Sequence, residues 1–326
     1  MIGRAEKIVT SLCDCDDRFV ITGATGWLGQ ALLALLSETC GEVLEQRVLL
    51  GGSVSRQITA PDGRNFPVHA LDELVLHLDD RPVMLFHFAF LTKDKVGRLS
   101  DTNYVAYNKQ IASVIGELAT KSCVKGIVLA SSGAVYDHLE EKSRDDSANL
   151  YGRLKFEDEQ LFGDICERRR IPLVIPRIFN LAGPYINKFQ SYALSSIIVN
   201  VLRGQAVNLK ASHKVWRSYV HVRDVLKLSL SLLQDRNTGT LLFDTAGEEV
   251  VELGELALRT CLELGRPDIG INRPELVSTT EDRYVGDGTL FQHLLKTHGI
   301  QPNSLSTQIR DSAEWIAATL ERSSHG

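Results

Sequence analysis

The sequence predicts an α/β protein with a doubly wound parallel sheet and a smaller mixed α/β lobe on its C-terminal side. Over the first 180 residues, short runs that are apolar throughout alternate with longer segments of helical periodicity. Strands that are apolar throughout are buried on both faces and need helices on both sides of the sheet. Right-handed crossovers in this order give a Rossmann-type sheet. With 326 residues, of which 44% are hydrophobic and 24% charged, the chain can form about two domains.

The predicted elements follow one another in regular alternation. The expected strands are residues 19–22, 47–50, 66–68, 83–88, 126–130 and 172–175. The expected helices are residues 27–38, 104–119 and 150–168. After residue 180 the pattern becomes irregular, with Gly and Pro between shorter elements.

The domain boundaries follow from this change of pattern. Residues 1–17 are expected to be a polar N-terminal extension, and residues 18–180 the sheet domain, with 216–245 returning to it. The remaining segments, 181–215 and 246–326, are expected to form the second, smaller lobe.

Composition excludes several classes of partner. The 36 Lys and Arg against 41 Asp and Glu give a net charge of −5, which argues against a nucleic-acid or anionic membrane partner. The longest apolar run, 83–91, is too short to span a bilayer, for which about 20 residues are needed. Six cysteines lack the spacing of a disulfide framework or a metal site. We therefore expect a cytoplasmic protein with reduced thiols and no metal.

A glycine-rich turn directly follows the first expected strand. The segment TGATGWLG places glycines three residues apart between a buried strand and an amphipathic helix. Such a turn lets backbone N–H groups approach a pyrophosphate at the helix N-terminus. It predicts dinucleotide binding by Gly23, Thr25, Gly26, Trp27, Leu28 and Gly29.

The end of the second expected strand indicates which dinucleotide binds. An acidic residue there would bind an adenosine ribose hydroxyl, but the chain has Gly51, Gly52 and Ser53, with Arg56 nearby. Ser53 and Arg56 are therefore candidate cofactor ligands, and NADP is favoured, with NAD also possible. The alternative is that Arg56 lies on a solvated loop.

A Ser–Tyr–Lys set follows in the second half of the sheet domain. Tyr151 and Lys155 are four residues apart, on one face of a helix. An ammonium beside a phenol lowers its pKa, so that Tyr151 can exchange a proton with a substrate oxygen during hydride transfer. Ser132 ends the fifth expected strand, at the sheet edge that faces the cofactor crevice, and can hydrogen-bond the same oxygen.

These motifs together resemble the extended short-chain dehydrogenase/reductase family, in particular its nucleotide-sugar epimerase/dehydratase group. The resemblance extends over nearly the whole chain after residue 18. It also rests on HFAF at 87–90, where the family has a His-x-Ala-Ala strand end, on Asn108, and on VLASSGAVY, PRIFNLAGP and RSYVHVRDV at 128–136, 176–184 and 217–225.

The resemblance implies roles for individual residues. Tyr151 would be the acid/base, Lys155 would contact the nicotinamide ribose, and Ser132 would polarise the substrate oxygen. Ala89 and Asn108 would lie in the cofactor site. Asn180 and Arg217 would face the diphosphate of a nucleotide-linked sugar, and Tyr219 would be a further substrate-binding residue. A homodimer through the helices at 104–119 and 150–168 is also implied.

Departures from the family pattern bear on the reaction. Dehydratases of the family carry a Thr-Asp-Glu type triplet, whereas this chain has Ser132-Gly133-Ala134, without a carboxylate. The segment 277–281 lacks an arginine that often completes diphosphate binding.

Four functions remain at this point. The sequence favours an NAD(P)-dependent reductase of a keto-sugar nucleotide. The alternatives are an NAD-dependent C4 epimerase of a nucleotide sugar and a reductase of a non-nucleotide carbonyl compound. A cofactor-sensing protein without turnover is disfavoured by the joint presence of Ser132, Tyr151 and Lys155.

Overall fold

The computed structural model describes residues 16–60, 62–92, 99–140, 146–277 and 280–324. These residues divide into two compact units, each described by itself. The sheet unit comprises the chain up to Ile178 together with 226–243 and 296–300, and the lobe unit comprises 179–225, 244–295 and the chain from Gln301. The segment that returns to the sheet unit is thus shorter than the expected 216–245. Most of the expected N-terminal extension, residues 1–15, lies outside the described residues.

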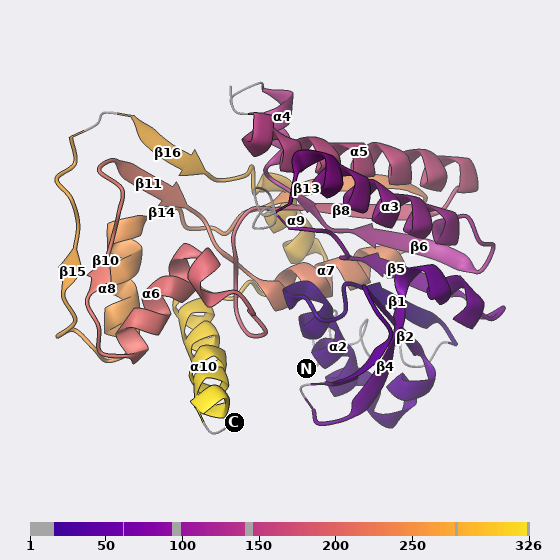
Figure 1. Cartoon of the computed structure of the whole chain (residues 1–326), viewed down its shortest axis with the longest axis horizontal. Coiled ribbons are helices and arrows are strands. Elements are labelled where there is room, and N and C mark those ends of the chain that lie inside the picture. Colours follow the sequence, from indigo (N-terminus) through magenta and orange to yellow (C-terminus); the bar gives the residue numbers. More distant parts are fainter. Residues whose placement is uncertain (1–15, 61, 93–98, 141–145, 278–279, 325–326) are drawn as a thin grey trace. The chain divides into compact units, whose positions relative to one another are not determined.

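The sheet unit is built on a mostly parallel sheet, which confirms the predicted fold class (Figure 1). Its strands are β1 (Arg18–Thr22), β2 (Val48–Gly52), β3 (Arg56–Thr59), β4 (Asn65–Ala70), β5 (Val83–His87), β6 (Val124–Leu129), β7 (Ser131–Ser132), β8 (Pro172–Ile178) and β13 (Gly239–Thr245). Their order is β13-β8-β6-β5-β1-β2-β4-β3, with β7 paired to β8. The strand order reverses between β1 and β5, so the ligand crevice of such a sheet lies beyond the carboxyl ends of these two strands.

Helices cover the sheet on both faces, with α3 and α5 side by side on one and α2 on the other (Figure 1). The helices of this part of the chain are α2 (Trp27–Cys40), α3 (Asp101–Ala119), α4 (Val135–Leu139), α5 (Asp146–Arg169) and α7 (Val222–Gln234), with 3-10 helices η1 (Gly41–Gln46) and η2 (Leu71–His77). Ile115 of α3 and Phe162 of α5 are fully buried in one cluster with Val20 of β1. This core fixes α5, and with it the Tyr–Lys pair, on the sheet.

Two local features differ from the sequence prediction. Helix α3 begins three residues early because the Ser100 hydroxyl accepts a hydrogen bond from the Asn103 N–H and caps the helix. Strand β3 was not predicted, since its polar residues are held only by antiparallel pairing with β4.

Among the cysteines, Cys123, Cys166 and Cys261 are free, whereas Cys40 is in a disulfide, so the prediction of reduced thiols is wrong at Cys40.

In the lobe unit, three of the α-helices pack on one another, and the short strands form small separate sheets. Its helices are α6 (Ala193–Leu202), α8 (Leu253–Glu263), α9 (Thr289–Thr297), α10 (Leu305–Ser324) and the 3-10 helix η4 (Phe189–Ser191). Its strands are β9 (Leu181–Ala182), β10 (Val207–Asn208), β11 (Lys214–Arg217), β12 (Val220–His221), β14 (Val251–Glu252), β15 (Ile271–Asn272) and β16 (Glu281–Tyr284). Strand β11 lies between β14 and β16, which places Arg217 at the end of a three-stranded sheet.

The described part of the chain holds no helix that is both long and apolar enough to cross a membrane. Among the same residues, no group of three or more His, Cys, Asp and Glu side chains is arranged to bind a metal ion.

Candidate active site

The glycine-rich turn brings the ends of β1 and β5 into direct contact. Gly23 has a φ of 69°, and a Cβ at this position would lie 2.8 Å from the Ala89 nitrogen. Only glycine allows both the conformation and the close approach. Helix α2 starts after Gly26 and has no acidic residue in its first turn, which leaves the partial positive charge of its N-terminus uncompensated. The turn, which includes Thr25, Trp27, Leu28 and Gly29, therefore fits the pyrophosphate of a dinucleotide.

Thr22 fixes the segment that follows β5. Its hydroxyl oxygen accepts hydrogen bonds from the backbone N–H groups of Phe88 and Ala89, at 3.1 and 3.2 Å, and lies 2.8 Å from His87 Nδ1. Burial lowers the pKa of His87 to about 3, so its imidazole is neutral and shares a hydrogen bond with the Thr22 hydroxyl, whose direction depends on the tautomer. Ala89 is thus held beside the glycine-rich turn by its backbone.

A close backbone contact joins helix α5 to the turn that follows Ser132. Ser132 lies on β7, and its hydroxyl accepts a hydrogen bond from the Ala134 N–H at 3.2 Å. A Cβ at Gly152 would lie only 2.0 Å from the Ala134 carbonyl oxygen. The second turn of α5 therefore packs directly against the turn after Ser132, and only glycine at position 152 permits this packing.

Tyr151 and Lys155 share one aromatic neighbour, Phe90. The Phe90 and Tyr151 rings are edge to face with centroids 5.5 Å apart, and Lys155 Nζ lies 3.8 Å above the Phe90 centroid. Lys155 Nζ also donates a hydrogen bond to the Ala130 carbonyl oxygen at 2.8 Å. The two polar side chains thus face the same side of α5, as the four-residue spacing predicts. Phe90 was not among the site residues predicted from the sequence.

Burial and nearby carboxylates together set the pKa of Lys155. Burial lowers the pKa of Lys155 to about 8, and the nearby Asp158 and Glu159 oppose this shift. Burial also raises the pKa of Asp158 to about 6, although the charge of Lys155 opposes the shift. A lysine with a pKa near neutrality is typical of functional sites.

A buried ion pair lies next to strand β7, which carries Ser131 and Ser132. Arg177 binds Glu159 through two hydrogen bonds, from Nε to Oε1 at 2.9 Å and from Nη2 to Oε2 at 2.7 Å. Glu159 also accepts a hydrogen bond from Ser131, the neighbour of Ser132, and the Arg177 guanidinium lies over the Tyr136 ring. Sequence reasoning missed this network, although Glu159 stands four residues after Lys155 and Arg177 lies in the PRIFNLAGP motif.

Asn108 is a structural anchor in this part of the site. Its side-chain oxygen accepts a hydrogen bond from the Leu91 N–H at 2.8 Å, and the Tyr104 hydroxyl donates to the Leu91 carbonyl at 2.7 Å. Helix α3 therefore holds Leu91, the residue after Phe90, at both its backbone N–H and its backbone carbonyl. A direct contact of Asn108 with a cofactor stays a prediction.

The end of β2 carries an acidic neighbour that the linear sequence did not reveal. Ser53 is exposed, and Arg56 is exposed on strand β3, not on a loop. The Ser55 hydroxyl donates to the Glu73 carboxylate at 2.6 Å, and this hydrogen bond lowers the pKa of Glu73. The Glu73 carboxylate of η2 thus lies beside the turn after β2, where the local sequence has no acidic residue.

In the lobe unit, the predicted substrate residues are engaged with their own surroundings. Asn180 Nδ2 donates to the backbone carbonyls of Ser218 and Tyr284, at 3.1 and 3.2 Å. Arg217 pairs with Asp282 through two hydrogen bonds, at 3.1 and 2.8 Å. Tyr219 is buried, and burial raises the pKa of its phenol above the usual range.

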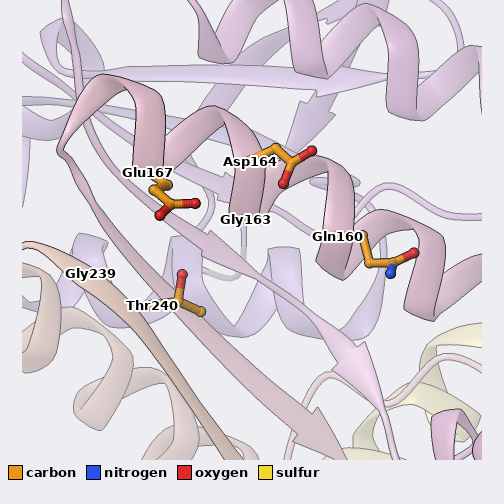
Figure 2. A pocket seen from close by; sticks show the side chains of 6 residues that line it. All are labelled: Gln160, Gly163, Asp164, Glu167, Gly239 and Thr240. Atoms are coloured by element: carbon orange, nitrogen blue, oxygen red, sulfur yellow. The ribbon is translucent and has the colours of Figure 1, made fainter.

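A cavity of about 690 Å³ lies elsewhere in the sheet unit, between α5 and the edge strand β13. Figure 2 shows Gln160, Asp164 and Glu167 along α5, with Thr240 on the strand. None of the predicted catalytic residues lines it. Its side chains supply two carboxylates and no cation, which does not suit an anionic nucleotide.

The family model of the NAD dependent epimerase/dehydratase family matches residues 19–242. The chain belongs to this family. The match covers the glycine-rich turn, the Ser–Tyr–Lys set and the RSYVHVRDV motif, and it confirms the resemblance to extended short-chain dehydrogenases/reductases. The chain is thus an enzyme of this family.

Known relatives share the architecture at low identity. UDP-glucuronic acid decarboxylase 6 of Arabidopsis thaliana is 27% identical over 287 residues, which cover 81% of this chain and 78% of that protein. The UDP-N-acetylglucosamine 4-epimerase from Methanobrevibacter ruminantium M1, solved with UDP-N-acetylmuramic acid, has a TM-score of 0.73 and 18% identity over 94% of this chain and 99% of that chain. The UDP-glucuronic acid 4-epimerase from Bacillus cereus, solved with UDP-glucuronic acid and NAD, has a TM-score of 0.69 and 17% identity over 93% and 99%.

Proposed function

We propose that this protein is an NAD-dependent 4-epimerase of a UDP-linked sugar, in which one retained cofactor takes a hydride and returns it. Family membership supports NAD, and structural neighbours include 4-epimerases with bound UDP-sugars. The observation that carries the choice of reaction is the turn after Ser132, where Gly133 and Ala134 supply no carboxylate for the removal of water. An epimerase needs one acid/base group, and Tyr151 provides it.

The residues of the sheet unit have distinct tasks in this reaction. The glycine-rich turn and the N-terminus of α2 bind the pyrophosphate, and Lys155 binds a ribose hydroxyl through its ammonium. NAD bound there would supply a reversible hydride acceptor, so that the hydride lost from one face of C4 could return to the opposite face. Tyr151 takes the proton of the C4 hydroxyl as the C–H bond breaks and returns it when the hydride returns. Ser132 donates a hydrogen bond to the oxygen at C4.

The residues of the lobe unit are proposed to bind the nucleotide end of the substrate. Arg217 has the planar fork of donors that suits a diphosphate. A diphosphate at this place takes over the hydrogen bonds that Arg217 makes to Asp282. Asn180 holds the backbone next to it through the Ser218 and Tyr284 carbonyls, and Tyr219 is proposed as a further substrate-binding residue.

Reduction of a keto-sugar nucleotide with NADP is the second candidate. It is supported by the exposed Arg56 and by the lack of an acidic residue at the end of β2. Glu73 opposes it, because a carboxylate beside that turn repels a 2′-phosphate. Comparison of NAD and NADP affinities for the protein and for Arg56→Ala separates the two cofactors.

Incubation with UDP-glucose, UDP-glucuronic acid and UDP-N-acetylglucosamine, each with NAD, tests the reaction. We expect a C4 epimer with no net change in nicotinamide absorbance, and a rate about 10²–10⁴-fold lower in Tyr151→Phe at nearly unchanged cofactor affinity. Stoichiometric oxidation of NADPH by a keto-sugar would establish the reductase instead. Full activity of Tyr151→Phe would contradict both mechanisms.

The predicted homodimer through α3 and α5 is also a proposal. Tyr107 on α3 and Leu161 on α5 are exposed apolar side chains, 49% and 36% accessible. Sedimentation equilibrium is expected to give twice the chain mass, and a double Tyr107→Glu, Leu161→Glu variant is expected to be monomeric. The predicted cytoplasmic location stays a prediction.

A further inference from the structure

Phe90 occupies a position where the family pattern has alanine. In this chain the strand end reads HFAF, and the extra ring lies between the two side chains that carry the chemistry. The Tyr151 ring meets it edge to face at 5.5 Å, and Lys155 Nζ lies over its face at 3.8 Å. An alanine could make neither contact.

We propose that Phe90 is the positioning residue of the Tyr151–Lys155 pair, holding the Lys155 ammonium on its ring face and the Tyr151 ring against its edge. The proposal rests on the proposed function for its catalytic meaning, but the contact and its effect on Lys155 can be measured without any sugar substrate.

The Phe90 ring can stabilise the charged form of the Lys155 side chain in its buried site. Burial disfavours the ammonium, and the other groups that face it offset this only in part. Asp158 and Glu159 favour the ammonium, but Glu159 is already bound by Arg177, and His87 on β5 is neutral. The face of a phenyl ring carries partial negative charge and attracts a cation without accepting a proton. Phe90 therefore supports the charged form of Lys155 inside a buried site.

The backbone on each side holds the ring in place. Before Phe90, the Ala89 N–H donates to Thr22; after it, Leu91 is bound at its N–H by Asn108 and at its carbonyl by Tyr104. These contacts come from β1 and α3, which belong to the same core as α5. Phe90 is therefore fixed relative to both residues that it contacts.

The test compares ring-free and ring-retaining variants of the full chain. Phe90→Leu and Phe90→Met keep an apolar side chain without a ring, and Phe90→Tyr keeps the ring. Phe156→Leu is the matched control, because Phe156 is the next residue of α5 after Lys155 and its ring meets His138 instead. Two ring-free variants keep the test available if one of them fails to fold.

The first readout is the titration of Lys155 in protein labelled with ¹³C at lysine Cε, with the resonance assigned by its absence in Lys155→Met. A cation–π contact of this kind shifts the protonation equilibrium about 2- to 30-fold, so the pKa is expected to fall by about 0.4–1.5 in Phe90→Leu and Phe90→Met. It is expected to stay unchanged in Phe90→Tyr and Phe156→Leu.

The second readout is NADH binding followed by fluorescence between pH 6 and 10. The loss of affinity on deprotonation of Lys155 is expected to move to lower pH by the same amount in the ring-free variants. An unchanged Lys155 titration in both ring-free variants, or an equal shift in Phe156→Leu, would overturn the proposal. If the titration shifts as expected while no sugar is turned over, the positioning role stands and only the proposed reaction fails.

Discussion

Each unit of the molecule contains an arginine that binds a carboxylate through two hydrogen bonds, and the two pairs differ in burial. In the sheet unit, the Arg177 and Glu159 side chains are 9% and 5% exposed; in the lobe unit, Arg217 and Asp282 are 19% and 45% exposed. The buried pair cannot be separated without leaving a charge in an apolar core. The exposed pair can exchange its carboxylate for another anion. Similar geometry thus gives a structural pair in one unit and a candidate binding group in the other.

Removal of the buried arginine is expected to have the largest effect. Arg177→Ala leaves Glu159 without its partner and is expected to lower the free energy of unfolding by about 3–5 kcal/mol, measured by urea denaturation. Arg217→Ala, the matched variant in the lobe, is expected to lower it by less than about 1 kcal/mol. Equal losses would contradict the distinction between the pairs.

Removal of Arg217, the partly exposed arginine of the lobe unit, is expected to act on binding. Arg217→Ala is expected to weaken UDP binding about 10- to 150-fold, the loss of charge-assisted hydrogen bonds worth about 1.5–3 kcal/mol. Isothermal titration calorimetry measures this effect. The control is Arg259→Ala, which removes an exposed arginine of the same unit that pairs with Glu249 and Glu255. Unchanged UDP affinity in Arg217→Ala would remove this residue from the substrate site.

A buried carboxylate without an arginine should make stability depend on pH. The pKa of Asp158 is raised from 3.8 to about 6, so the folded state holds this proton more tightly than the unfolded state. The contribution of Asp158 to stability is therefore greatest below about pH 4 and is lost as the pH rises to about 6.

Asp158→Asn, which cannot ionise, is expected to be more stable than the parent by about 1–3 kcal/mol at pH 7.5, with a smaller difference at pH 5. Urea denaturation at the two pH values gives both differences. Asp164→Asn, an exposed change on the same helix, is expected to give no pH-dependent difference. A difference for Asp158→Asn that does not vary with pH would show that its ionisation is not linked to folding.

The smallest effect is expected at the acidic partner in the lobe. Asp282→Asn frees Arg217 from an ion pair that a diphosphate would otherwise displace, and UDP affinity is expected to rise about two- to fivefold. The same titration measures it. A decrease in affinity would mean that Asp282 holds Arg217 in its binding orientation.

The sheet unit was more predictable from the sequence than the lobe unit. Buried strands such as β1 and β5 are continuous apolar runs, and the Tyr151–Lys155 spacing is a local property of one helix. The contacts of Phe90, Glu159 and Glu73 were missed because each joins residues distant in sequence, and composition does not encode such pairs. Strand β3 was not predicted because it has no apolar pattern of its own and is stabilised by pairing with β4.

The contact between Gly152 and the Ala134 carbonyl has a consequence for how this site can change. Main-chain atoms set the spacing between α5 and the turn after Ser132, and the Ser132 hydroxyl holds that turn through the Ala134 N–H. The side chain at position 151 can therefore be exchanged to install other chemistry without rebuilding the scaffold. Position 152 is the residue that such a redesign must leave untouched.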